Sequence, residues 1–258
     1  MRRGFSLVEM SIVLVIIGLI VGGVMIGQNL IVAARMKTVG TDMVRYKDLA
    51  TQFRERYYAW PGDFNGASIW GLSNATFNTC DTIATTNGTT QTCNGDGDDR
   101  IELDADTSSS ANNMVESARA FQHLSNAGLM DGQFSGVMNG GSLSTARAYV
   151  DFPAGPIDGS FYFYDYIDNS SGSDSSVWRL PIGNIIHLYL SSGAATPKQI
   201  KEIDIKMDDG LPGKGRFMVR NWDECTNAAN NAQHSIAIYD LVNPVGEACN
   251  AFYLIDPR

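Results

Sequence analysis

The chain has 258 residues, enough for one sizeable globular domain with appended segments. It carries 19 Lys and Arg against 28 Asp and Glu, a formal net charge of −9, so a nucleic acid, which requires a basic surface, is not expected as a partner. Positive charge is concentrated at Arg2 and Arg3 and again between residues 35 and 56, whereas the chain beyond is acidic.

An apolar segment follows the first basic residues. No residue from Met10 to Ala34 is charged. As a helix this segment would be roughly 37 Å long, enough to cross a hydrocarbon core of about 30 Å. No small-residue cleavage site of the secretory type follows it. An uncleaved anchor and a buried core helix are the simple interpretations, but neither explains Glu9, because a carboxylate at the edge of a spanning helix is costly and indicates a function.

The residues from Arg2 to Glu9, RRGFSLVE, resemble the class III signal of type IV pilins and type II secretion pseudopilins. In that family a basic leader ends in glycine and precedes an unbroken apolar helix. The resemblance implies that prepilin peptidase cuts between Gly4 and Phe5 and that Phe5 is then N-methylated. It also gives Glu9 a role in assembly, since the acid meets the N-terminal amine of a neighbouring subunit, a pairing that is favoured in an apolar fibre core.

One feature departs from the family pattern. Many members carry a proline within the apolar segment, at a position where this chain has Ile26. Glycines occur instead, and they either let the helix bend and approach its neighbours closely or are simply tolerated in a membrane helix. The glycines are Gly18, Gly22, Gly23 and Gly27.

Apolar residues continue at three- and four-residue steps after Ala34 and stop before Pro61, which predicts an amphipathic continuation of the same helix. The predicted organisation is a leader (1–4), a transmembrane and assembly helix (5–34), its amphipathic continuation (35–60) and a globular periplasmic or surface head (61–258).

The head is expected to contain two helices and an antiparallel sheet. The first helix covers about residues 111–129 and starts with a capping box of Asn113 and Glu116, and the second opens at Thr196 with Gln199 at its third position. Strand-like runs occur at 148–152, 161–166, 185–190, 216–219, 235–239 and 252–255. The predicted fold class is therefore α+β, with a long N-terminal helix packed on a head that contains an antiparallel β-sheet.

The cysteines form two pairs that are local in sequence and show no CxxC spacing, which argues against a zinc knuckle. Behind a membrane-targeting segment they predict two disulfides in an oxidising compartment, and four free thiols in a cytosolic domain are the alternative. The simplest pairing joins Cys80 to Cys93 and Cys225 to Cys249.

Acidic residues after Cys93 resemble the start of an EF-hand calcium loop. The pattern is incomplete, because Asp99 replaces the usual glycine and Ala105 replaces the bidentate glutamate. Calcium and a solvated acidic turn are the two interpretations. The candidate ligands are Asn94, Asp96, Asp98, Glu102 and Asp104.

A second acidic group lies near the C-terminal end of the short helix at Thr196, where the helix dipole favours cations rather than acids. It therefore needs a counter-charge, for which a nearby Lys or Arg is the preferred source and calcium the weaker candidate. The acids are Asp204, Asp208 and Asp209, and the basic residues are Lys206, Lys214 and Arg216. No cofactor is required otherwise.

Catalysis has no support from motifs. HExxH, GxSxG, P-loop and GxGxxG patterns are absent from the sequence, and the three histidines, His123, His187 and His234, are far apart along the chain. The protein is therefore not expected to be an enzyme.

The resemblance implies a structural subunit of a type IV pilus or a type II secretion pseudopilus. Such a subunit sits in the bacterial inner membrane with its head in the periplasm and then polymerises with itself or with sibling pilins. Its further partners are prepilin peptidase and the inner-membrane assembly platform. A membrane-anchored binding protein or adhesin is the alternative, and Glu9 separates the two because a simple anchor has no use for it.

Overall fold

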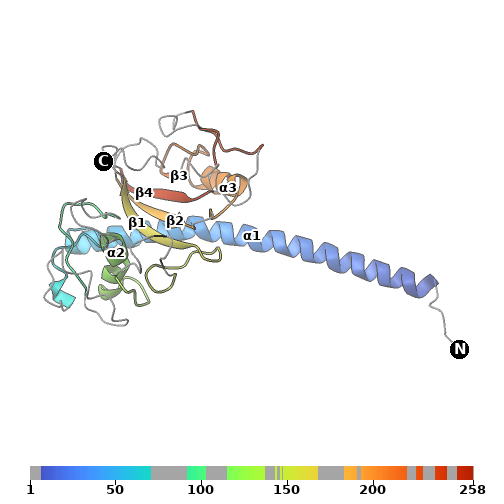
Figure 1. Ribbon diagram of the computed structural model, residues 1–258, viewed down its shortest axis with the longest axis horizontal. Helices are drawn as coiled ribbons and strands as arrows, with labels where there is room; N and C mark the ends of the chain where they lie inside the picture. The colour runs from blue at the N-terminus through green and yellow to red at the C-terminus, as the bar shows by residue number, and fades with distance from the viewer. Residues whose placement is uncertain are drawn as a thin grey trace.

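The computed structural model describes residues 7–70, 92–102, 115–136, 143, 146, 148–167, 183–190, 193–219, 225–228, 236–242 and 249–257. A long helix leads into a head in which helices pack beside one sheet (Figure 1). The elements are α1 (Leu7–Tyr57), the 3-10 helix η1 (Ala67–Trp70), α2 (Val115–Asn126), β1 (Phe161–Ile167), β2 (Gly183–Tyr189), α3 (Pro197–Met207), β3 (Phe217–Val219) and β4 (Ala251–Pro257). The predicted α+β fold class is confirmed.

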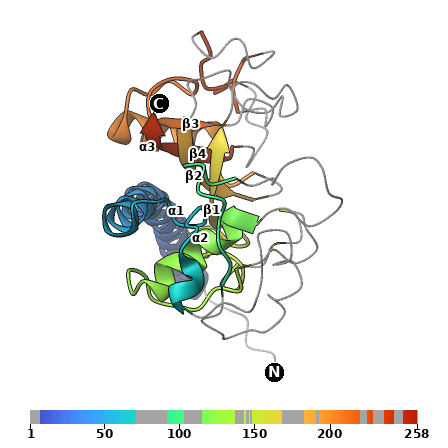
Figure 2. The ribbon, with the colours of Figure 1, turned by 90° about the vertical axis from the view of Figure 1, so that its left-hand side faces the viewer.

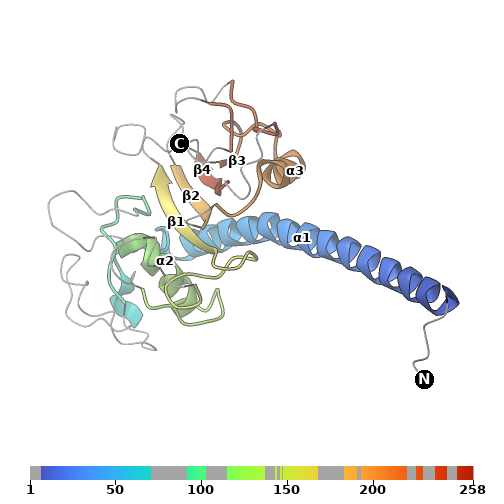
Figure 3. The ribbon, with the colours of Figure 1, turned by 45° about the vertical axis from the view of Figure 1, so that its right-hand side comes forward.

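Helix α1 is continuous over 51 residues. Its first half projects away from the head and its second half lies against the sheet (Figures 1 and 3). Burial begins at Val39, and the buried side chains recur at three- and four-residue intervals, as expected for one face of a helix. They are Val39, Met43, Tyr46, Leu49, Ala50 and Phe53.

The end of α1 is set by local backbone geometry. Tyr58 adopts a positive φ of 58°, which takes the chain out of the helix ahead of Pro61. Gly62 follows with a φ of 94°, and a Cβ at this position would lie 2.4 Å from the carbonyl oxygen of Glu116. Only glycine therefore fits where this turn passes against α2.

The sheet is antiparallel with the order β1-β2-β4-β3. In its register Phe163 lies opposite His187, which in turn lies opposite Phe252. Four of the six strand-like runs form these strands, with ends that differ by up to two residues from the predicted ones.

Two predicted strands are wrong. Within 148–152 the chain turns back on itself, because Tyr149 has a φ of 67° and its N–H bonds to Phe152 at 2.8 Å. In the described part of 235–239, Ile238 bonds to both the backbone and the side chain of Asn227. One bridge, between Thr226 and Tyr239, takes the place of a ladder.

The core lies where α1 and α2 meet the sheet. The Tyr164 hydroxyl on β1 donates to the backbone oxygen of Tyr46 on α1 at 2.7 Å, and the ring of Phe121 on α2 packs on both tyrosines. Viewed end-on, α1 lies between α2 and α3 (Figure 2). A smaller cluster consists of Ile167, Ile185, Met218, Ala237, Phe252 and Leu254.

Helix α3 begins as the sequence predicts. The Thr196 side chain accepts the Gln199 N–H, and the Gln199 side chain returns a bond to the Thr196 backbone, which completes the capping box. The helix ends at Met207, with Asp208 as its C-cap. The second acidic group therefore lies at this end of α3.

Candidate functional site

The projecting half of α1 is the most exposed apolar surface of the described chain. A window of 18 residues in this helix has a mean hydropathy of 2.7 and no buried residue. Within the described residues, α1 is the one helix that is long and apolar enough to span a membrane. The Ser11 hydroxyl donates to the Val8 carbonyl oxygen at 2.8 Å, so its polar group needs no partner in lipid.

The four glycines of this segment face open space. A Cβ added at any of them would meet nothing within 4 Å, so they make no close contact inside this chain. Their surface is therefore free for a neighbouring helix. They do not interrupt α1, since the helix is continuous through all four.

Of the residues predicted for processing and assembly, Glu9 is described and is exposed in the first turn of α1. A carboxylate there is favoured by the helix dipole. Gly4 and Phe5 lie outside the described residues. The structure places Glu9 at the end of α1 that is remote from the head (Figure 1).

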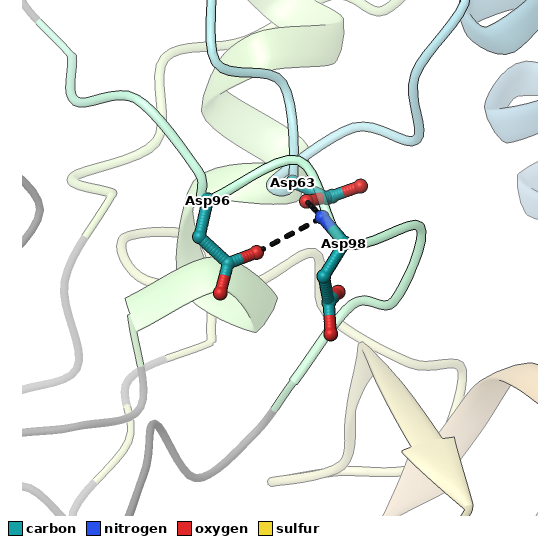
Figure 4. Close-up of side chains that lie close together, drawn as sticks. All are labelled: Asp63, Asp96 and Asp98. Carbon is teal, nitrogen blue, oxygen red and sulfur yellow. Dashed lines mark hydrogen bonds between the residues drawn. The ribbon is translucent and has the colours of Figure 1, made fainter.

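The first acidic group is organised by a residue that sequence reasoning missed. Asp63, in the turn after α1, is 1% exposed and lies beside Asp96 and Asp98 (Figure 4). Its carboxylate accepts the backbone N–H groups of Gly97 at 2.6 Å, Asp98 at 3.1 Å and Asp99 at 2.9 Å. Carboxylate oxygens of the three acids lie within 4.8 Å of one another.

Glu116 performs a similar role from α2. It is buried, and its two carboxylate oxygens accept the backbone N–H groups of Asp96 and Glu102, each at 3.2 Å. The predicted capping box of Asn113 and Glu116 is not tested, because Asn113 lies outside the described residues. Together Asp63 and Glu116 hold the 92–102 segment against α1 and α2.

Both buried acids hold their protons unusually well. Burial, reinforced by Asp98 and Asp96, raises the pKa of Asp63 to about 7 against the opposing backbone hydrogen bonds. Burial and the neighbouring Asp63 raise the pKa of Glu116 to about 8. The cost of removing a carboxylate from water thus exceeds the gain from the amides it accepts.

Two members of the EF-hand-like ligand set, Asp96 and Asp98, are brought together beside Asp63. Asp98 pairs with Arg100 at 3.3 Å, and Glu102 lies 3.8 Å from the same guanidinium. Asn94 is half-buried and its side-chain oxygen Oδ1 has no hydrogen-bond partner, and Asp104 lies outside the described residues. The carboxylates of this turn accept backbone amides and pair with an arginine.

The second acidic group is brought together by the end of α3. Asp204 is fully buried, whereas Asp208 and Asp209 are exposed, and one oxygen from each lies within 4.8 Å of the others. The basic side chains that were expected to neutralise these acids do not pair with them. Among the described residues, no Lys or Arg side-chain nitrogen lies within 4.0 Å of these carboxylates, which excludes the predicted pairing with Lys206, Lys214 or Arg216 in this structure.

The disulfide between Cys225 and Cys249 is present, with 5.1 Å between the Cα atoms. It ties the start of β4 to the described residues 225–228. Cys93 is also disulfide-bonded, and Cys80, its predicted partner, lies outside the described residues.

The described histidines serve the core. His123 is fully buried, its Nδ1 accepts the Gly62 N–H at 2.9 Å, and its Nε2 donates to the Cys93 carbonyl oxygen at 3.0 Å. Burial lowers its pKa to about 3, so the ring stays neutral. His187 is buried in β2 between Phe163 and Phe252, and His234 lies outside the described residues.

Residues 1–25 match the family model of the prokaryotic N-terminal methylation motif, the cleavage and methylation signal of type IV pilins and pseudopilins. The predicted resemblance to type IV pilins and type II secretion pseudopilins is confirmed for this part of the chain. No curated protein and no solved structure matches the chain. The motif marks pilin-like structural proteins, and here it leads directly into the projecting apolar half of α1.

Proposed function

We propose that this protein is a structural subunit of a type IV pilus or a type II secretion pseudopilus and polymerises through the projecting half of α1. One observation carries the proposal: the methylation motif at residues 1–25 opens a helix whose apolar first half packs on nothing in its own head. An apolar surface of this size has to be covered by lipid or by other subunits.

The length of α1 suits both a subunit held in the membrane and a subunit packed in a filament. The 32 residues from Leu7 to Thr38, ahead of the first buried residue, span about 48 Å as a helix, more than a hydrocarbon core of about 30 Å. A subunit waiting in the inner membrane would therefore hold its head clear of the bilayer, on the periplasmic side. The same surface would pack against neighbouring subunits in the filament.

In this proposal Glu9 guides assembly. Cleavage after Gly4 would create a positive α-amine on Phe5, close to the membrane edge. In the apolar fibre core an unpaired charge costs several kcal/mol, so the amine of an arriving subunit would seek the Glu9 carboxylate of its neighbour. Prepilin peptidase and an inner-membrane assembly platform are the partners that such a route requires.

Filament incorporation of Glu9 variants tests the proposal. Glu9→Leu should reduce the ratio of sheared filament to membrane-bound subunit at least tenfold, with membrane insertion unchanged. Glu9→Asp should give an intermediate ratio, since the charge survives on a shorter side chain. Glu55→Leu, at an exposed position on the head half of the same helix, is the matched control and should assemble normally.

Resistance of the head to protease should be equal in all these variants, which separates an assembly defect from misfolding. Normal filament yield from Glu9→Leu would contradict the proposal. That result would favour the alternative of a membrane-anchored binding protein or adhesin.

A further inference from the structure

The second acidic group contains a buried carboxylate oxygen without a hydrogen-bond donor. Asp204 is 0% exposed, and its Oδ2 accepts the Tyr239 hydroxyl at 2.7 Å. Its Oδ1 is buried and has no hydrogen-bond partner. A buried acceptor left in this state costs about 1–3 kcal/mol, more if the group is charged.

The neighbours of Asp204 add charge of the same sign. Carboxylate oxygens of Asp208 and Asp209 lie within 4.8 Å of the Asp204 carboxylate. Asp208 accepts the backbone N–H groups of Arg216 and Phe217 through Oδ2, and Asp209 accepts that of Leu211 through Oδ1. These bonds fix both side chains beside Asp204 and use one oxygen of each.

Nothing in the described residues compensates the three acids. No basic side chain pairs with them, and they lie at the C-terminal end of α3, where the helix dipole is also negative. The one other titratable group in direct contact is the Tyr239 hydroxyl, which is neutral. Burial, reinforced by Asp209 and Asp208, raises the pKa of Asp204 to about 7 despite the hydrogen bonds from the Tyr239 hydroxyl and the Gly210 backbone N–H.

We propose that Asp204, Asp208 and Asp209 bind a divalent cation of the calcium type, with Oδ1 of Asp204 as its buried ligand. Oxygen ligands select hard cations, and Ca²⁺ binds oxygens at about 2.3–2.6 Å, so two ligands across one ion lie up to about 5 Å apart. The oxygens of this group lie within that span. The ion would join the end of α3 to the 210–217 turn and, through Tyr239, to the residues near the disulfide.

The two acidic groups differ in a way that supports this choice. At Asp63 both carboxylate oxygens accept backbone amides, and Asp98 pairs with Arg100. No carboxylate oxygen of Asp63, Asp96 or Asp98 is buried without a partner among the described residues, whereas the amide oxygen Oδ1 of the neighbouring Asn94 is. Asp98 is therefore a control position, because its carboxylate is already paired with Arg100.

Calcium titration of the full-length chain in detergent micelles tests the proposal. After treatment with a chelator, CaCl₂ should bind with one site per chain and a Kd of about 10⁻³ M or tighter, as in extracellular calcium modules, and should raise the midpoint of thermal unfolding. Asp204→Asn and the exposed-site variant Asp209→Asn should each weaken binding at least tenfold. Asp98→Asn, in the other acidic group, should bind as the parent does.

Three outcomes would overturn the proposal: no calcium binding by the parent chain, an equal loss in Asp98→Asn, or undiminished binding in Asp209→Asn. Because Asp209 is exposed and lies beyond the end of α3, its variant tests the site even if Asp204→Asn fails to fold. A parent chain that responds to pH but not to calcium would show that a proton on Asp204, rather than a cation, relieves the buried charge.

Discussion

Asp63 accepts a hydrogen bond from the backbone N–H of Gly97 at 2.6 Å, across 34 positions of sequence. The same carboxylate accepts the next two amides, at Asp98 and Asp99. A single side chain in the turn after α1 thus fixes three consecutive amides of the 92–102 segment. The attachment of that segment to the head depends on this contact.

Asp63→Asn should therefore destabilise the head by about 2–3 kcal/mol. An amide offers one acceptor oxygen and turns an NH₂ group toward the amides that the carboxylate accepted. The measurement is urea unfolding of the full-length chain in detergent. Asp158→Asn, at an exposed position, is the control, and equal stability of the two variants would contradict the role assigned to Asp63.

Stability should fall as the pH rises from about 4 to 8. The pKa values of Asp63 and Glu116 are raised from 3.8 and 4.5 to about 7 and about 8, so over this range the folded chain binds more protons than the unfolded chain. The two carboxyl groups therefore contribute fully to stability at a pH below their pKa values in the unfolded chain. This contribution is lost as the pH rises through their pKa values in the folded chain.

Glu116→Gln should flatten this pH dependence, because the glutamine side chain does not titrate. The free energy of unfolding of parent and variant, compared at pH 5 and pH 8, is the relevant measurement. An unchanged slope in the variant would mean that Glu116 is ionised in the folded head.

Local sequence signals predicted much of the fold. The spacing of Val39, Met43 and Tyr46 marks the face of α1 that packs on the head, and Thr196 with Gln199 marks the start of α3. The run at 235–239 alternates well, yet Ile238 pairs with Asn227 in a loop. In this run Ala237 and Tyr239 are buried whereas Ile236 and Ile238 are exposed, so the sequence pattern predicted neither the buried side chains nor the absence of a pairing strand among the described residues.

The site residues were harder to predict, because their roles depend on contacts between distant segments. Asp63 is separated from Asp96 by more than thirty residues, and its one local signal is its position after Pro61 and Gly62. Among the acids near Asp96, for which calcium and a solvated turn were the two interpretations, the backbone hydrogen bonds to Asp63 were not foreseen. At Asp204 the decisive feature, a buried oxygen without a donor, can be seen only once α3 is packed against Tyr239.

Gly40 should be required for close packing of α1 on α3. A Cβ at this position would lie 2.8 Å from Sδ of Met207 and 3.6 Å from Cγ2 of Ile203. Gly40→Leu should lower the stability of the head by about 1–3 kcal/mol, as overpacking does. Gly40→Ala should cost less, since the flexible Met207 can shift and alanine favours the helix by about 1 kcal/mol.

Thermal unfolding of the full-length chain measures both Gly40 variants. Gly27→Leu is the matched control, because the same helix presents open space at that position. Equal melting of Gly40→Leu and Gly27→Leu would show that α3 is not held by this contact.

Removal of the disulfide by Cys225→Ala with Cys249→Ala should cost about 3 kcal/mol, the loop entropy expected for a separation of 24 residues. The effect should reach the start of α3, because the backbone of Cys249 bonds to Ala195 at 2.9 Å. In the variant, the backbone amide of residue 249 should lose more protection from hydrogen exchange than the amide of Leu188 in the centre of the sheet. An equal loss of protection at both amides would show that the disulfide stabilises the whole head rather than this region.

Gly4→Ala should leave the leader uncut, whereas the parent chain should begin at N-methylated Phe5. The match at residues 1–25 implies this cleavage, and the positive leader residues Arg2 and Arg3 are expected to hold the cut site on the cytoplasmic side. An uncut chain carries no α-amine at Phe5, so it should insert into the membrane yet be missing from filaments.

Intact mass of the membrane-bound and sheared fractions measures both effects, with Ser6→Ala, on the mature side of the cut, as the control that should be processed normally. A mature parent chain that retains Met1 would contradict the assignment of the signal, and filaments built from uncut Gly4→Ala would show that assembly does not need the amine.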